Sequence, residues 1–245
     1  MKLYGRNPVL ERLKTNPKSI LRLFITPKHE ESAYLLRKAK KWRIPVAIVP
    51  PSKIQKMARN LNAQGLLAEV EAFAYRSYDE LLDLALGKSV TPVFLDGLND
   101  PQNLGGILRS LACLGPFSLV LPTHHSVEVT ESVLRVASGG DNFVPVAKVS
   151  NLNQAIKTAR DRGIWMAGAV VSGGQDIRTT KFIFPMGLVI GSEHKGIRDV
   201  IRRQLDAELT LPMAHPRLSM NAAHAATLFG YEIIRQRACS LRGEE

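Results

Sequence analysis

Apolar and polar positions follow two different periods along residues 4–72. Short apolar runs, one with partial alternation, have the length of β-strands, whereas the segments between them carry apolar residues at helical spacing. Strands are predicted at 21–26, 45–49 and 65–71, and helices at 7–14, 31–42 and 52–60. About seventy residues are enough for a small α/β domain.

From Thr91 onward, short apolar runs alternate regularly with helical patterns. Such alternation predicts a mainly parallel sheet covered by helices. Ligands collect at the carboxyl ends of parallel strands, so the loops after Asp96, Gly168, Gly191 and Leu211 are expected to carry chemistry. The strands are predicted at 93–96, 118–121, 144–149, 164–171, 187–191 and 208–211, and the helices at 104–114, 127–138, 152–162, 198–205 and 220–237.

Three parts follow from these patterns. Residues 1–74 form the first domain, 75–90 a linker that ends in an amphipathic helix, and 91–245 the second domain. A hydrophobic content of 45% indicates a folded globular protein. Without an apolar run of about twenty residues or an apolar N-terminus, we expect a cytoplasmic protein away from membranes. Cys113 and Cys239 are expected to be isolated buried thiols.

Positive charge is concentrated in the first part of the chain. Residues 1–75 hold 15 Lys and Arg against 5 Asp and Glu, while the remainder holds 18 against 17. Clustered basic residues suit a polyanion such as RNA, because each neutralised phosphate releases condensed counterions. A solvated basic surface without a partner is the alternative.

The loop after Asp96 leads into a helix with an N-cap predicted at Asn103. Gly105 and Gly106 precede Arg109 by four and three positions, so they share its helix face and leave its side chain a clear path. A guanidinium over a helix N-terminus suits phosphate; a tight turn with a surface arginine is the alternative. The chain lacks both GxGxxG and the Walker GK[ST] motif, which disfavours nicotinamide, flavin and nucleoside triphosphates.

Two later loops are also candidates. In Gly191-Ser192-Glu193, glycine allows close backbone approach, and Glu193 could bind a substrate, orient Arg109 or be a simple helix N-terminal acid. The segment 209–226 passes from a strand to an Ala-rich helix with an N-cap predicted at Ser219. Its histidines lack a third ligand, so no metal is expected.

These motifs, in this order, resemble the SpoU/TrmH family of SPOUT methyltransferases. The resemblance is closest to bacterial 23S rRNA guanosine 2′-O-methyltransferases, and it covers nearly the whole chain. The segments that carry it are Asn103-Leu-Gly105-Gly-Ile-Leu-Arg109, Gly191-Ser192-Glu193, Pro212-Met213 to Ser219-Met220-Asn221, Tyr4 to Leu10, and Ala137-Ser138-Gly139-Gly140.

The resemblance implies a fold and a cofactor. An RNA-binding domain like ribosomal protein L30e would precede a SPOUT α/β domain with a deep trefoil knot, in a homodimer packed partly through the last helix. S-adenosylmethionine would lie in the knot. The residues implied to hold it are Gly168, Ile190, Gly191, Leu211, Met213, Ser219 and Met220.

The same resemblance implies methylation of a ribose 2′-hydroxyl in RNA, with no metal required. Arg109 matches the family's catalytic arginine, and the other site residues would be Asn103, Glu193, Ser219 and Asn221. A guanidinium holds its proton too tightly to act as a base, so we expect Arg109 to clamp phosphate and stabilise the developing alkoxide. The alternatives are a tRNA 2′-O-methyltransferase and a non-catalytic RNA-binding or ribosome-assembly protein.

The chain departs from the family pattern on the expected cofactor wall. His215 replaces a usual glycine, Met220 a leucine, and Ala222-Ala223-His224 a Val-Ser-Val segment, while His194-Lys195 adds positive charge beside Glu193. The polar site positions are all present. The departures therefore bear on cofactor affinity more than on the fold.

Overall fold

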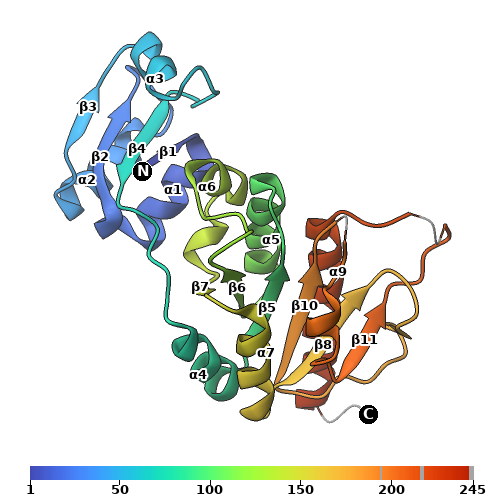
Figure 1. Ribbon diagram of the computed structural model, residues 1–245. Coiled ribbons are helices and arrows are strands. Elements are labelled where there is room, and N and C mark those ends of the chain that lie inside the picture. Colours follow the sequence, from blue (N-terminus) through green and yellow to red (C-terminus); the bar gives the residue numbers. More distant parts are fainter. Residues whose placement is uncertain (194, 216–217, 243–245) are drawn as a thin grey trace. The chain divides into compact units, whose positions relative to one another are not determined.

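The computed structural model describes residues 1–193, 195–215 and 218–242, and the chain forms two compact units (Figure 1). The first unit contains Met1–Ala74 together with Val129–Phe143. The second unit contains Tyr75–Glu128 and the chain from Val144 onward. Each unit has its own sheet.

The first unit is built on a four-stranded sheet in the order β1-β4-β2-β3. β4 runs antiparallel to both β1 and β2, whereas β2 and β3 are parallel. Leu23, Leu66 and Leu67 are fully buried in its core. The strands are β1 (Lys2–Tyr4), β2 (Ile20–Ile25), β3 (Val46–Ile48) and β4 (Leu66–Val70), and the helices are α1 (Arg6–Thr15), η1 (Pro17–Ser19), α2 (Ser32–Trp42) and α3 (Pro51–Met57).

A segment far along the chain completes the first unit. It contains α6 (Glu131–Ala137) and η2 (Gly140–Asn142). The Glu131 carboxylate accepts a 2.7 Å hydrogen bond from the Lys2 backbone N–H, and Arg12 forms a buried ion pair with Asp141. Residues 129–143 fall within the predicted second domain at 91–245, but their contacts along the chain group them with the first unit.

The second unit contains a seven-stranded sheet in the order β7-β6-β5-β10-β8-β11-β9, with every pair parallel. β5, β6 and β10 are nearly continuous runs of buried residues, as expected for strands covered on both faces. The strands are β5 (Thr91–Asp96), β6 (Phe117–Pro122), β7 (Val146–Val149), β8 (Trp165–Val170), β9 (Gln175–Asp176), β10 (Met186–Gly191) and β11 (Ala207–Thr210).

Helices cover this sheet, and two of them pack closely. They are α4 (Tyr78–Lys88), α5 (Pro101–Leu114), α7 (Leu152–Asp161), α8 (Asp199–Arg202) and α9 (Ala222–Arg242). α5 and α9 approach through small residues, because a Cβ on Gly106 would lie 3.1 Å from the Ala223 Cβ. Gly106 therefore admits α9, and it is not simply a gap in front of Arg109.

The order of the strands defines a switch point between β5 and β10. The chain proceeds from β5 to β6 and β7 on one side, whereas β8 and β11 lie beyond β10 on the other. Loops at the carboxyl ends of β5 and β10 diverge there and leave room for a ligand.

All predicted strands are present, but several details differ. β1 and β9 were missed, since two or three residues carry too little periodicity. The N-cap of α5 is Asp100, which accepts a 2.8 Å bond from Gln102 N–H, so the predicted cap at Asn103 is wrong. Ser219 is not the cap of α9 either, because Asn221 precedes the helix and accepts from Ala223 N–H at 2.8 Å.

Two further properties can be stated for the described residues. Cys113 is exposed on α5 and Cys239 is half-buried on α9, so the expectation of two buried thiols is wrong: neither position is enclosed by the core. Among the helices of the described ranges, none combines the length and apolar character that crossing a bilayer requires.

Candidate active site

Three polar side chains from distant parts of the sequence form one hydrogen-bonded network beside the switch point. The Asn103 amide donates to Glu193 Oε1 at 2.6 Å. The Asn221 amide donates both to Asn103 Oδ1 at 2.7 Å and to Glu193 Oε1 at 2.9 Å. These are three of the residues predicted from the sequence, and the fold brings them together.

Local structure explains why each member points as it does. Because Asp100 caps α5, Asn103 lies in the first turn of the helix, where it is only 5% exposed. Asn221 Oδ1 caps α9, which leaves its amide nitrogen to donate. Glu193 Oε2 accepts no hydrogen bond from a described residue. One carboxylate oxygen is therefore free to receive a donor from a substrate.

A cavity of about 470 Å³ adjoins this network at the carboxyl ends of β8, β10 and β11. We call it the strand-end cavity. Its volume falls in the range of small-ligand sites, about 300–1,000 Å³. Six of the seven residues that the resemblance implied for cofactor binding line it, together with Glu193. They are Ile190, Gly191, Leu211, Met213, Ser219 and Met220.

Gly191 occupies a position that only glycine can hold. A Cβ there would lie 2.1 Å from the Gly196 carbonyl carbon and 2.3 Å from the Ile197 nitrogen. The chain returns over Gly191 because Ser192 and Gly196 exchange two backbone hydrogen bonds, at 3.1 and 2.9 Å. Gly191 therefore lets two stretches of backbone pack against each other at the end of β10, where both line the strand-end cavity.

Gly168 is the one implied cofactor residue that does not line the strand-end cavity. A Cβ on Gly168 would meet the Leu205 Cδ1 atom at 2.4 Å, so this glycine makes room for a packed side chain. Ala169 and Val170, the next two residues of β8, line the cavity. The carboxyl end of an apolar strand was the signal that could have identified them.

Arg109 is an exposed residue of α5. It does not line the strand-end cavity, and it takes no part in the Asn103–Glu193–Asn221 network. Of the roles considered for Glu193, orienting Arg109 is not observed within the chain, because Asn103 and Asn221 bind the Glu193 oxygen. The expected catalytic group and the cavity are therefore separate in a single copy.

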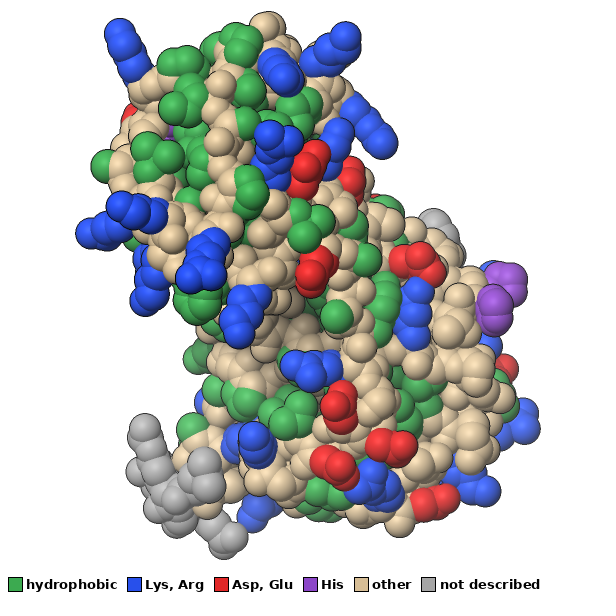
Figure 2. All heavy atoms as spheres, turned by 90° about the vertical axis from the view of Figure 1, so that its left-hand side faces the viewer, with side chains coloured by type: hydrophobic (Ala, Val, Ile, Leu, Met, Phe, Trp, Pro, Cys, Tyr) green, Lys and Arg blue, Asp and Glu red, His purple; other side chains and the backbone are tan. Residues whose placement is uncertain are grey.

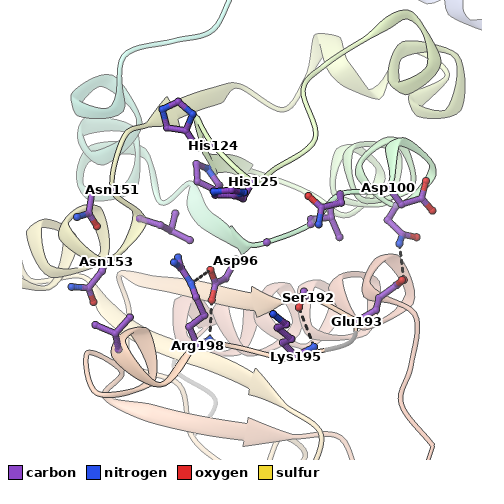
Figure 3. A pocket seen from close by; sticks show the side chains of 18 of the residues that line it. Asp96, Asp100, His124, His125, Asn151, Asn153, Ser192, Glu193, Lys195 and Arg198 are labelled. Carbon is purple, nitrogen blue, oxygen red and sulfur yellow. Dashed lines mark hydrogen bonds and ion pairs between the residues drawn. The ribbon is translucent and has the colours of Figure 1, made fainter.

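Sequence reasoning missed one charged pair. Asp96, at the end of β5, is 2% exposed and accepts bonds from the Arg198 backbone N–H at 2.9 Å and side-chain Nε at 2.7 Å (Figure 3). An acidic residue as the last residue of a largely apolar strand was the available signal. As for metals, no group of three ligating His, Cys, Asp or Glu side chains occurs within the described ranges.

The fold and site are those of an α/β methyltransferase with its cavity at the carboxyl edge of a parallel sheet. The SpoU methyltransferase AviRb of Streptomyces viridochromogenes, solved in complex with the cofactor AdoMet, superposes with a TM-score of 0.79 at 25% identity. The alignment covers 97% of this chain and 90% of that one. An rRNA methyltransferase from Sinorhizobium meliloti, 24% identical, shares the fold with the same TM-score over 96% of this chain and 86% of that one.

Sequence comparison assigns the family. The SpoU rRNA Methylase profile matches residues 91–231, and the profile for RNA 2′-O ribose methyltransferase substrate binding matches 2–76. YacO of Bacillus subtilis, assigned to the TrmH family of tRNA/rRNA methyltransferases, is 35% identical over 95% of this chain and 94% of its own length. The chain belongs to the SpoU rRNA methylase family and is an RNA methyltransferase, which confirms the resemblance.

Proposed function

We propose that the protein transfers a methyl group from S-adenosylmethionine to the 2′-hydroxyl of a guanosine in large-subunit (23S) rRNA. The observation that carries this proposal is that the expected cofactor-binding residues and the polar network meet at the strand-end cavity. Six residues implied for cofactor binding line the strand-end cavity, and so does Glu193, which Asn103 and Asn221 hold by hydrogen bonds. A related protein with AdoMet bound shares the fold.

The chemistry asked of these residues is alignment and charge stabilisation. The methyl group of the cofactor is already activated, so the protein must orient a ribose oxygen for in-line attack and help remove its proton. Glu193 Oε2, which has no donor among the described residues, is placed to hold the hydroxyl. Arg109 would clamp a phosphate and stabilise the developing alkoxide.

A homodimer belongs to this proposal. Arg109 does not line the strand-end cavity of its own chain, so a second copy would have to present it. α9 exposes Leu228 and Tyr231, which are 41% and 60% accessible and suit a protein interface. We also propose a trefoil knot in the catalytic domain and an L30e-like fold for the first domain. The proposed domain division is residues 1–74, a linker at 75–90, and residues 91–245.

Support for an RNA substrate comes from the basic first domain. Figure 2 shows that Lys and Arg side chains outnumber acidic ones over the face of the first unit in view, in agreement with the excess within residues 1–75. The match to a substrate-binding profile covers this part of the chain. Phosphate contacts give affinity without sequence information, so they do not distinguish rRNA from tRNA. The experiment must therefore compare the two RNAs as substrates. Such a substrate places the enzyme in the cytoplasm.

The test is transfer of labelled methyl from S-adenosylmethionine to deproteinised rRNA and tRNA pools, followed by nuclease digestion and identification of the nucleoside. We expect 2′-O-methylguanosine from 23S rRNA. The same nucleoside from tRNA would reassign the substrate. Absence of transfer to either pool and to precursor ribosomal particles would refute the proposal, and a missing thermal shift with the cofactor would indicate a non-catalytic RNA-binding protein.

A further inference from the structure

A second and larger cavity lies beside the strand-end cavity within the second unit. Its volume is about 860 Å³, and it opens at the carboxyl ends of β5, β6, β7 and β10, at the switch point of the sheet. We call it the switch-point cleft. The two cavities share one wall, formed by Ser192, Glu193, Lys195 and Gly196.

The side chains around the switch-point cleft come from several separate elements (Figure 3). His124 and His125 follow β6, Asn151 and Asn153 lie at the start of α7, and Arg198 follows β10. Amide groups hydrogen-bond base edges, imidazole rings stack on bases, and guanidinium groups bind phosphate. This combination suits an unstacked nucleotide better than an apolar ligand.

Each acidic side chain of the cleft already accepts at least one hydrogen bond, although Glu193 Oε2 accepts none from a described residue. Asp96 is bound by Arg198, the Asp100 carboxylate caps α5, and Glu193 is held by two amides. Among the described residues, no acidic partner is present for the Lys195 ammonium, and the terminal guanidinium nitrogens of Arg198 have no acceptor. These cationic groups can therefore receive a phosphate.

One buried acceptor in the cleft has no partner. The carbonyl oxygen of the half-buried Asn153 is shielded from solvent and accepts no hydrogen bond from any described residue. Leaving such an atom unsatisfied costs stability. If the Asn153 side chain turned toward the cleft, an N–H group on the edge of a base would supply the missing donor.

We propose that the switch-point cleft holds the RNA nucleotide whose ribose is methylated, unstacked from its neighbours. Its base lies among Asn153, His124 and His125, and its ribose faces the wall shared with the strand-end cavity. There Glu193 can reach the hydroxyl while the methyl donor occupies the other side. This inference rests on the proposed function, because it places the acceptor of that reaction.

Kinetics with matched variants provide the first test. His124→Ala/His125→Ala and Asn153→Ala should each raise the KM for rRNA about tenfold, the effect expected for one lost base contact. The dissociation constant for S-adenosylmethionine should stay unchanged, because none of the three residues lines the strand-end cavity. Asn153→Asp, which keeps an acceptor oxygen, should restore the KM. Lys157→Ala removes an exposed charge of α7 outside the cleft and serves as the control.

A KM for rRNA that stays at the wild-type value in both variants would overturn the inference. Cross-linking decides it independently of turnover. Ribosomal RNA containing 6-thioguanosine, irradiated with the full-length protein and S-adenosylhomocysteine, should yield cross-links within residues 122–126 or 150–153. Cross-links confined to residues 1–75 would overturn it as well. If the wild-type protein transferred no methyl group, the proposed function would fail while cross-linking still decided the nucleotide position.

Discussion

The two units use their charged side chains in opposite ways. In the first unit, Arg12 and Asp141 form an ion pair whose side chains are only 7% and 1% exposed, while most other charges lie on the surface. In the second unit, Asp96 is equally buried, at 2%, but its partner Arg198 is 56% exposed and lines the switch-point cleft. An ion pair with both side chains buried can only stabilise the fold, whereas a pair with one exposed partner can also bind a ligand.

The two units also differ in the direction of their strands and in their net charge. The first unit has a mixed sheet with antiparallel neighbours and an excess of basic residues, which suits RNA binding through phosphates. The second unit is nearly neutral, and its parallel strands deliver polar loops to one edge. RNA affinity and methyl-transfer chemistry should therefore respond to different substitutions.

The largest effect is expected from Asp141→Ala in the first unit. Removing one partner leaves the Arg12 charge buried and unpaired, which should destabilise this unit by about 3–5 kcal/mol. Urea unfolding followed by Trp42 fluorescence in a Trp165→Phe background would measure the loss. Cofactor binding should not change.

The paired replacement Arg12→Met/Asp141→Leu provides the control. It removes both charges, so it should recover most of the lost stability. Burial raises the pKa of Asp141, with Arg12 opposing that shift, so the carboxylate is costly to keep charged without its partner. Loss of cofactor affinity in Asp141→Ala would show that the two units are energetically coupled and would break the comparison.

The next largest effect is expected from Arg109→Ala in the second unit. Methyl transfer should fall about 10²- to 10³-fold, the size seen when one charge-stabilising donor is removed. S-adenosylmethionine binding should persist because Arg109 lies outside the strand-end cavity. Arg109→Lys should lose as much activity if the guanidinium acts through two parallel bonds. Full activity in Arg109→Ala would remove this residue from the mechanism.

Gly191→Ala should have an intermediate effect. The new methyl group would collide with the backbone of Gly196 and Ile197, and relieving the clash should cost about 1–3 kcal/mol and distort the cofactor wall. Isothermal titration with S-adenosylmethionine should show weakened binding. Gly87→Ala, in α4 with open space around its Cα, is the matched control and should be neutral or slightly stabilising. Normal cofactor affinity in Gly191→Ala would contradict the prediction.

The smallest effect is expected from Tyr78→Phe. Its hydroxyl donates to the Ala155 carbonyl at 2.6 Å, and losing this bond should cost about 0.5–1.5 kcal/mol without changing methyl transfer. Burial raises the pKa of Tyr78, so the wild-type protein should lose stability as pH rises above the ordinary tyrosine value of about 10. The melting temperature should depend less on pH in Tyr78→Phe than in the wild type across that range. An equal pH dependence in the two proteins would contradict the role of Tyr78.

Much of this architecture could be predicted from the chain. Apolar runs located the strands because a parallel sheet buries whole segments. The resemblance to the SpoU/TrmH family, carried by motifs in the loops after those strands, marked Asn103, Glu193 and Asn221 as candidates. The caps were harder. Asp100 and Asn103, like Ser219 and Asn221, are all good cap residues, and backbone geometry chose between them.

The sequence alone therefore determined which elements form, which residue types follow each strand, and where positive charge is concentrated, since local periodicity and composition are properties of neighbouring residues. Only the tertiary structure decided that residues 129–143 complete the first unit, that Gly168 packs under Leu205, and that the switch-point cleft opens beside the strand-end cavity. Each of these depends on contacts between segments far apart in the chain, which no local pattern records.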